Sequence, residues 1–116
     1  NSSLVLKLHY KDISMLFTGD IEKEIENKLV QNEEDIDADI LKTAHHGSNT
    51  STTQDFLEFV SPKAVVICVG KNNFGHPSPE VMERFEEKKI PVFRTDKHGA
   101  VIIKSNGRRI TVRTML

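Results

Sequence analysis

Two adjacent histidines, His45 and His46, follow an apolar segment and stand directly before a glycine, Gly47. A neutral imidazole is the most common side-chain ligand of transition metals, and it can also transfer protons near neutral pH. Consecutive side chains of an extended segment point to opposite sides, so the two rings can face one target only if the backbone turns, which Gly47 allows. The pair is therefore either a metal or catalytic site at a strand end, or an exposed strand end that carries two histidines.

Asp20 and His76 stand in comparable places in the chain. Asp20 follows the alternating residues 13–17, and His76 closes a polar loop that follows the apolar run 64–69. The carboxyl ends of parallel strands meet at one edge of a sheet, so these loops and the histidine pair could lie close together. One carboxylate with two or three imidazoles is the ligand set of a catalytic zinc site.

Each of these residues also has an ordinary structural interpretation. Aspartate is favoured at the N-cap of a helix, and Asp20 precedes the helical pattern of residues 21–31. His76 could be a loop histidine that only supports the turn before Pro77. His9 alternates with apolar residues beside Lys7, which indicates an exposed position.

The elements that must position these residues form an α/β pattern. Alternating residues over 3–10 and 13–17 predict a β-hairpin with one buried face. Asn106-Gly107 predicts a second hairpin, formed by residues 100–104 and 109–113. Between the hairpins, helical patterns alternate with strands. Helices are expected over 21–31, from a capping-box pattern at residues 52–55, and after Ser78 as N-cap. Strands are expected over 38–43, 64–69 and 91–94.

The composition excludes several classes of protein. With 116 residues, the chain is long enough for one domain and too short for two ordinary ones. No apolar segment approaches the ~20 residues needed to span a bilayer, so we expect this chain by itself to be soluble. The net charge of -1 gives no overall attraction to nucleic acid. A local basic surface is the alternative to an ordinary solvated one, and its candidates are Lys71, Arg94, Lys97, Arg108 and Arg109.

Three ordered motifs carry a resemblance to a known family. They are Thr18-Gly19-Asp20, Ala44-His45-His46-Gly47-Ser48 and Gly75-His76-Pro77-Ser78. Together they resemble the C-terminal half of a metallo-β-lactamase-fold hydrolase, in the branch of the ComEC-type competence proteins. The resemblance covers nearly all of residues 1–116 and implies the second αβ half of an αββα sandwich, a mixed sheet with helices packed on one face.

The resemblance also implies roles for individual residues. Asp20 would be a metal ligand, often bridging two ions, and His46 would bind the second ion, with His45 supporting the site as a catalytic residue. His76 would contact the substrate phosphate or protonate the leaving group. Substrate contacts would come from Ser48, Ser51 and Asn73. The implied cofactors are two zinc or manganese ions in the complete domain.

One motif of the family is missing from this sequence. The family's first metal-binding motif lies N-terminal to the matching segment, and none of residues 1–11 can replace it. A catalytic zinc needs three protein ligands and an open position, so we expect this chain alone to bind zinc weakly or not at all and to be inactive. The expected partners are an upstream half-domain and, through the exposed sheet edge, a second copy of the chain.

The resemblance therefore predicts part of a metal-dependent phosphodiester hydrolase, a DNA nuclease of a DNA-uptake protein. The longer parent would be tethered to a bacterial membrane with this domain facing outward, and DNA or another phosphodiester would be its substrate. Two alternatives stay open: a module that binds phosphate or nucleic acid without cleaving it, and an esterase for phosphorylcholine or small phosphodiesters.

Overall fold

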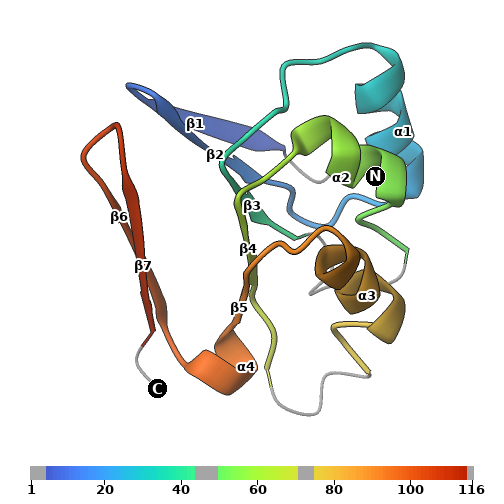
Figure 1. Cartoon of the computed structure of the whole chain (residues 1–116). Helices are drawn as coiled ribbons and strands as arrows, with labels where there is room; N and C mark the ends of the chain where they lie inside the picture. The colour runs from blue at the N-terminus through green and yellow to red at the C-terminus, as the bar shows by residue number, and fades with distance from the viewer. Residues whose placement is uncertain (1–4, 44–49, 71–74, 115–116) are drawn as a thin grey trace.

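The computed structural model describes residues 5–43, 50–70 and 75–114, which form a sheet between two layers (Figure 1). The central sheet has five strands in the order β1-β2-β3-β4-β5. The helices α1 (Lys23–Gln31), α2 (Gln54–Val60) and α3 (Pro79–Glu87) cover one face, and a separate two-stranded hairpin packs on the other (Figure 1). The predicted α/β class, a mixed sheet with helices on one face, is confirmed.

The strands of the central sheet are β1 (Leu6–Tyr10), β2 (Ile13–Phe17), β3 (Ile40–Lys42), β4 (Ala64–Ile67) and β5 (Val92–Arg94). β1 and β2 form the predicted antiparallel hairpin, whereas β2, β3, β4 and β5 pair in parallel. The parallel register aligns Leu16 with Leu41 and Leu41 with Val65. The segments that follow β2, β3, β4 and β5 therefore leave the sheet at the same edge.

The helices are α1 (Lys23–Gln31), α2 (Gln54–Val60), α3 (Pro79–Glu87) and the short α4 (Thr95–His98). Thr53 caps α2 by accepting the amide of Phe56 at 3.2 Å, one residue after the start of the predicted capping box at residues 52–55. Ser78 caps α3 in the same way through the amide of Val81. A side-chain oxygen at the N-cap satisfies an amide that the helix itself leaves free.

The first helix begins later than predicted. Its N-cap is Glu22, which forms no capping hydrogen bond through its side chain, so the interpretation of Asp20 as the helix cap is wrong. Instead, the amide of Lys23 donates to the carbonyl of Thr50 at 2.9 Å. The start of α1 is therefore satisfied by a distant segment of the chain rather than by a local cap.

The sheet separates two apolar clusters. On the helix side, Val65 and Ile67 pack with residues of α2 and α3. On the other side, Ala64 and Val66 pack against the hairpin of β6 (Val101–Ser105) and β7 (Ile110–Thr114). β4 contributes to both clusters, which explains why its sequence is apolar throughout.

The N-terminal hairpin differs from the expectation in its burial. Leu6 is 45% exposed and Leu8 is 50% exposed, although both were expected on a buried face. β1 is the edge strand, and the apolar side chains of β6 and β7 pack over β2, β3 and β4 rather than over β1. His9 is exposed, as predicted.

The two hairpins touch at their turns. The amide of Asp12 donates to the carbonyl of Gly107 at 2.8 Å. Gly107 has φ +92°, and the side chain of Lys11 lies directly against it. None of the helices in the described part of the chain has the length and apolar character that a membrane crossing requires.

Candidate functional site

Asp20 lies in a short turn that is held at both ends. The buried hydroxyl of Thr18 donates to the carbonyl of Lys42 at 2.7 Å, which joins the end of β2 to the end of β3. The amide of Ile21 donates to the carbonyl of Thr18 at 3.2 Å, and Gly19 takes the positive φ of 53° that this turn requires. Ile21 is fully buried, whereas Asp20 is exposed at the carboxyl edge of the sheet.

The segment that follows the histidine motif lies against this turn. Ser51 is fully buried, and its hydroxyl donates to the carbonyl of Ile21. The carbonyl of Thr50 accepts the amide of Lys23. Hydrogen bonds therefore hold residues 50–51 to Ile21 and Lys23, which closely follow Asp20 in the chain.

A buried carboxylate holds the next two residues of the same segment. Glu26 of α1 is fully buried, and its side chain accepts the amide of Thr53 at 2.9 Å and the amide of Thr52. Burial raises the pKa of Glu26, while the hydrogen bonds from Thr53 and Thr52 and the charge of Arg84 act in the opposite direction.

Arg84 of α3 binds this segment from the other side. Its guanidinium donates to the carbonyl of Thr52 at 2.8 Å and to that of Ser51 at 3.5 Å. Because α3 begins one residue after Ser78, the helix that follows the third motif contacts the segment that follows the second. Segments next to all three motifs are thus joined by hydrogen bonds.

Glu26 was not among the residues predicted from the sequence. Its position three residues before Leu29 and four before Val30 places it on the buried side of α1. The sequence signal for this role was a glutamate at a position where the helical periodicity favours an apolar residue. Only the fold shows which backbone groups it binds.

His76 is half-buried in the connection between β4 and α3. Its Nδ1 atom is buried and has no hydrogen-bond partner among the described residues, and the same holds for the hydroxyl of Thr43 at the end of β3. An unsatisfied buried nitrogen is a group that could bind a ligand or another part of the chain. The catalytic role of His76 stays a prediction.

Several predicted site residues lie outside the described residues: His45, His46, Ser48 and Asn73. Their roles as catalytic, metal-binding and substrate-binding residues stay predictions. Ser51 is described, and its hydroxyl is engaged with the carbonyl of Ile21 inside the protein. Its substrate-binding role is likewise untested.

The donors in the described segments do not make a metal site by themselves. In these parts of the chain, no group of three His, Cys, Asp or Glu side chains lies in an arrangement that could hold an ion. Asp20 offers a carboxylate, but a catalytic zinc needs three protein ligands. The chain would therefore fit a metal only if the histidine motif and further residues complete the set.

The end of β5 is a second polar region at this edge. The hydroxyl of Thr95 donates to the carbonyl of Val69 at 2.9 Å and accepts its amide at 2.8 Å. Arg94 binds Asp96 through two nitrogen atoms, at 3.0 and 2.7 Å, and this contact lowers the pKa of Asp96. Because Arg94 is paired, it contributes little charge to the local basic surface considered above.

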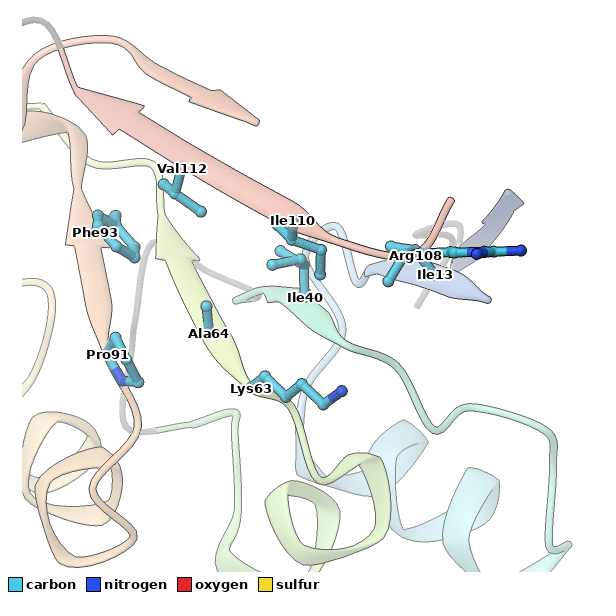
Figure 2. Close-up of a pocket in the computed structure, with 9 residues that line it drawn as sticks. All are labelled: Ile13, Ile40, Lys63, Ala64, Pro91, Phe93, Arg108, Ile110 and Val112. Atoms are coloured by element: carbon cyan, nitrogen blue, oxygen red, sulfur yellow. The ribbon is translucent and has the colours of Figure 1, made fainter. Parts of the chain in front are cut away.

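A pocket of different character lies between the sheet and the C-terminal hairpin (Figure 2). Its walls are largely apolar and include Ile40, Ala64, Phe93 and Ile110, with Lys63 at one end. Ala64 opens β4, so the pocket reaches toward the edge opposite Asp20. It is not part of the candidate site.

No protein-family model matches the sequence, but a comparison with known proteins finds relatives. ComE operon protein 3 of Bacillus subtilis is 39% identical over 109 residues, which cover 93% of this chain and 14% of that protein. Competence protein ComA of Neisseria gonorrhoeae is 36% identical over 101 residues, or 85% of this chain and 15% of that protein. Recombination protein 2 of Haemophilus influenzae is 37% identical over 89 residues, or 76% of this chain and 11% of that protein. The chain is therefore homologous to one segment of competence proteins and spans about one-seventh of the length of the first of these relatives.

Proposed function

We propose that this chain is the C-terminal half of a metal-dependent phosphodiester hydrolase that acts on DNA within a competence protein. The observation that carries the proposal is the hydrogen-bonded junction between the Asp20 turn and residues 50–53, the segment that follows the histidine motif. Homology to Competence protein ComA supports the biological role. The metallo-β-lactamase fold, the nuclease activity and the metals all belong to the proposal.

In the proposed site, Asp20 and His46 would hold the metal ions, and His45 would support His46. Bound zinc or manganese would supply an activated water and positive charge next to the phosphate. His76 contacts the phosphate or protonates the leaving oxygen, because its imidazole can transfer a proton near neutral pH. Hydrogen bonds on both sides of Asp20 hold the backbone from which its carboxylate projects, which supports a role as a metal ligand.

The missing donors would come from an upstream half-domain. The described donors are too few for a catalytic ion, so the proposal needs further ligands from outside this chain. Leu6, Leu8 and Tyr10 expose an apolar stripe on the edge strand, and an upstream half-domain would cover it. The chain alone is then inactive.

The proposal is tested in the longer protein that contains this chain. We expect this longer protein to bind two metal ions and to cleave DNA. Asp20→Asn keeps the shape of the side chain but loses its charge, so we expect it to lower cleavage at least ~100-fold and to release metal. The control is His9→Gln, because His9 is an exposed histidine away from the candidate site.

Four results would contradict the proposal or change it. Full cleavage by Asp20→Asn would remove Asp20 from the site. A longer protein that binds DNA and metal yet never cleaves would indicate a binding module. Cleavage restricted to phosphorylcholine esters or small phosphodiesters would indicate the other class of substrate. For the 116-residue chain alone, tight stoichiometric zinc binding by calorimetry would contradict the need for an upstream half.

A further inference from the structure

The C-terminal hairpin concentrates positive charge. Residues 97–116 contain five of the 16 Lys and Arg residues of the chain and none of its 17 Asp and Glu residues. Their formal charge is therefore +5, which leaves 11 basic against 17 acidic residues, or -6, in the rest of the chain. The net charge of -1 is thus the sum of two larger opposite charges in different parts of the sequence.

The alternation of the strands places the side chains of this hairpin on two faces. β6 and β7 form the layer opposite the helices (Figure 1). The apolar positions Val101, Ile103 and Ile110 pack against the central sheet. Successive residues of a strand point to opposite sides, so Lys104 and Arg113 face outward, and both are exposed.

An open hollow on the outward face brings several hydrogen-bond donors together. It is lined by Lys104, Ser105, Asn106, Arg109 and Thr111. The Oδ1 atom of Asn106 already accepts the amides of Arg108 and Arg109, each at 2.9 Å, and the Oγ atom of Ser105 accepts the amide of Gly107 at 2.9 Å. The two cationic side chains and the amide nitrogen of Asn106 can only donate. A ligand with several oxygen acceptors, such as a phosphate, fits this set of groups.

The cations of the outward face are not neutralised within the described residues. The ion pairs in that part of the chain all use other lysines and arginines, and Lys104, Arg109 and Arg113 are exposed. An ordinary solvated surface mixes charges of both signs, whereas the sequence of this hairpin contains only positive ones. The hairpin is therefore complementary to an anionic partner.

These cations form a line rather than a single cluster. Four residues of a strand span about 13 Å, which separates Arg109 from Arg113 along β7. The hairpin turn lies at the start of β2, because the amide of Asp12 donates to the carbonyl of Gly107. Arg113 pairs with the second residue of β6, and β6 begins just after α4, which follows the end of β5. The line therefore runs from the edge opposite Asp20 toward the edge where Asp20 lies.

We propose that the outward face of the C-terminal hairpin binds the phosphate backbone of a DNA strand through Lys104, Arg109 and Arg113. The choice of DNA as the polyanion rests on the proposed function, whereas the binding surface rests on the hairpin alone. Lysine and arginine contacts to phosphates supply affinity without sequence preference, and they release counterions from the nucleic acid. A membrane surface fits less well, because Ile102 is the one large apolar side chain exposed on this face of the described hairpin.

The test measures DNA binding by the 116-residue chain in the presence of EDTA, so that cleavage plays no part. The probe is a fluorescein-labelled oligothymidylate of about 20 nucleotides, followed by fluorescence anisotropy between about 50 and 200 mM salt. We expect a Kd of about 1–100 µM, a range typical of binding without sequence preference. The double variant Lys104→Gln with Arg109→Gln should raise the Kd about 10-fold or more. It should also make the slope of log K against log salt less negative by about 1.4, because each single-strand phosphate contact contributes about 0.7.

Arg113→Gln tests whether the binding surface extends along β7. It removes one contact, so we expect the salt slope to change by about 0.7 and the Kd to rise by a smaller factor than in the double variant.

Two control variants separate the hairpin surface from net charge and from side-chain shape. Lys28→Gln with Lys89→Gln removes the same number of charges from exposed positions outside the hairpin, so DNA affinity should stay within about 2-fold. Lys104→Arg with Arg109→Lys exchanges the side chains but keeps both charges, so the salt slope should not change. All of these positions are exposed, and urea unfolding should show the same stability within about 0.5 kcal/mol.

The outcomes distinguish this inference from the proposed function. An unchanged Kd and salt slope in Lys104→Gln with Arg109→Gln would overturn the inference, and so would equal losses in this variant and in the Lys28 and Lys89 control. Unchanged DNA binding together with lost sedimentation on phosphatidylglycerol vesicles would assign the surface to anionic lipid and also overturn it. If the longer protein never cleaved DNA, the nuclease proposal would fail, but binding that depends on the hairpin cations would still support this inference.

Discussion

The hydroxyl of Ser51 offers a direct measure of how strongly the two motif segments are joined. Ser51→Ala removes the hydrogen bond to the carbonyl of Ile21, and both residues are fully buried, so water cannot replace the hydroxyl. Leaving a buried acceptor without its partner costs about 1–3 kcal/mol. With a urea m-value of about 1.5 kcal/mol/M, a loss of about 1.5 kcal/mol lowers the unfolding midpoint by about 1 M.

The matched control is Ser61→Ala, measured by urea unfolding followed by circular dichroism. The hydroxyl of Ser61 donates to the carbonyl of Glu58 only three residues away, and the site is exposed to water. We expect a change of about 0.5 kcal/mol or less there, because solvent satisfies both groups. If Ser51→Ala proved no more destabilising than Ser61→Ala, the junction between the Asp20 turn and residues 50–53 would not contribute to stability, and the reasoning would be refuted.

Three further predictions concern other contacts. Burial raises the pKa of Glu26 above the unfolded value of 4.5, so ionising this residue costs the folded state free energy. The free energy of unfolding should therefore fall as the pH rises from 4.5 through the raised pKa. Glu26→Gln should flatten this part of the plot of stability against pH, as measured by urea unfolding. Gly107→Ala should destabilise the chain by about 1–2 kcal/mol, because φ is +92° and a Cβ would lie 2.5 Å from a carbon of Lys11. At the control position Gly70 a Cβ would meet nothing within 4 Å, so Gly70→Ala should change the unfolding free energy by less than about 0.5 kcal/mol. Thr95→Val removes both hydrogen bonds to Val69 and should cost about 1–3 kcal/mol in thermal or urea unfolding, whereas the same change at the exposed Thr111 should be nearly neutral.

Structural features that depend on contacts between residues close together in the sequence were predictable. The caps at Thr53 and Ser78 act through amides three residues away, so a short pattern contains both partners. β4 is apolar because both of its faces are covered, which a short window also shows. The Asn106-Gly107 turn likewise lies within the hairpin that it predicts.

Features that depend on distant partners were not predictable. The start of α1 is set by the bond from Lys23 to Thr50, and the burial of Glu26 by amides 26 and 27 residues away. The exposure of Leu6 and Leu8 follows from which strands the C-terminal hairpin covers. Each of these depends on tertiary packing, which a local pattern does not contain.

The meeting of two strand-end segments at one edge of the sheet was predictable, whereas the roles of the predicted site residues stay predictions. Parallel pairing of β2 and β3 does bring the Asp20 turn and the segment after the histidine motif together, as the strand-end argument required. The hydrogen bonds of Glu26 and Arg84 to residues 51–53 were not predicted, because they join two helices through the backbone of a third segment.

The covering of the sheet by the last hairpin also has a consequence during synthesis. Ile40, Ala64 and Val66 pack against Val101, Ile103 and Ile110, so one face of β3 and β4 is completed by residues translated dozens of codons later. At about 5–20 residues per second, this face stays bare on the ribosome for seconds. Nascent chains that have not reached the hairpin therefore present an apolar sheet surface, and chaperone binding is expected to be concentrated in that interval of translation.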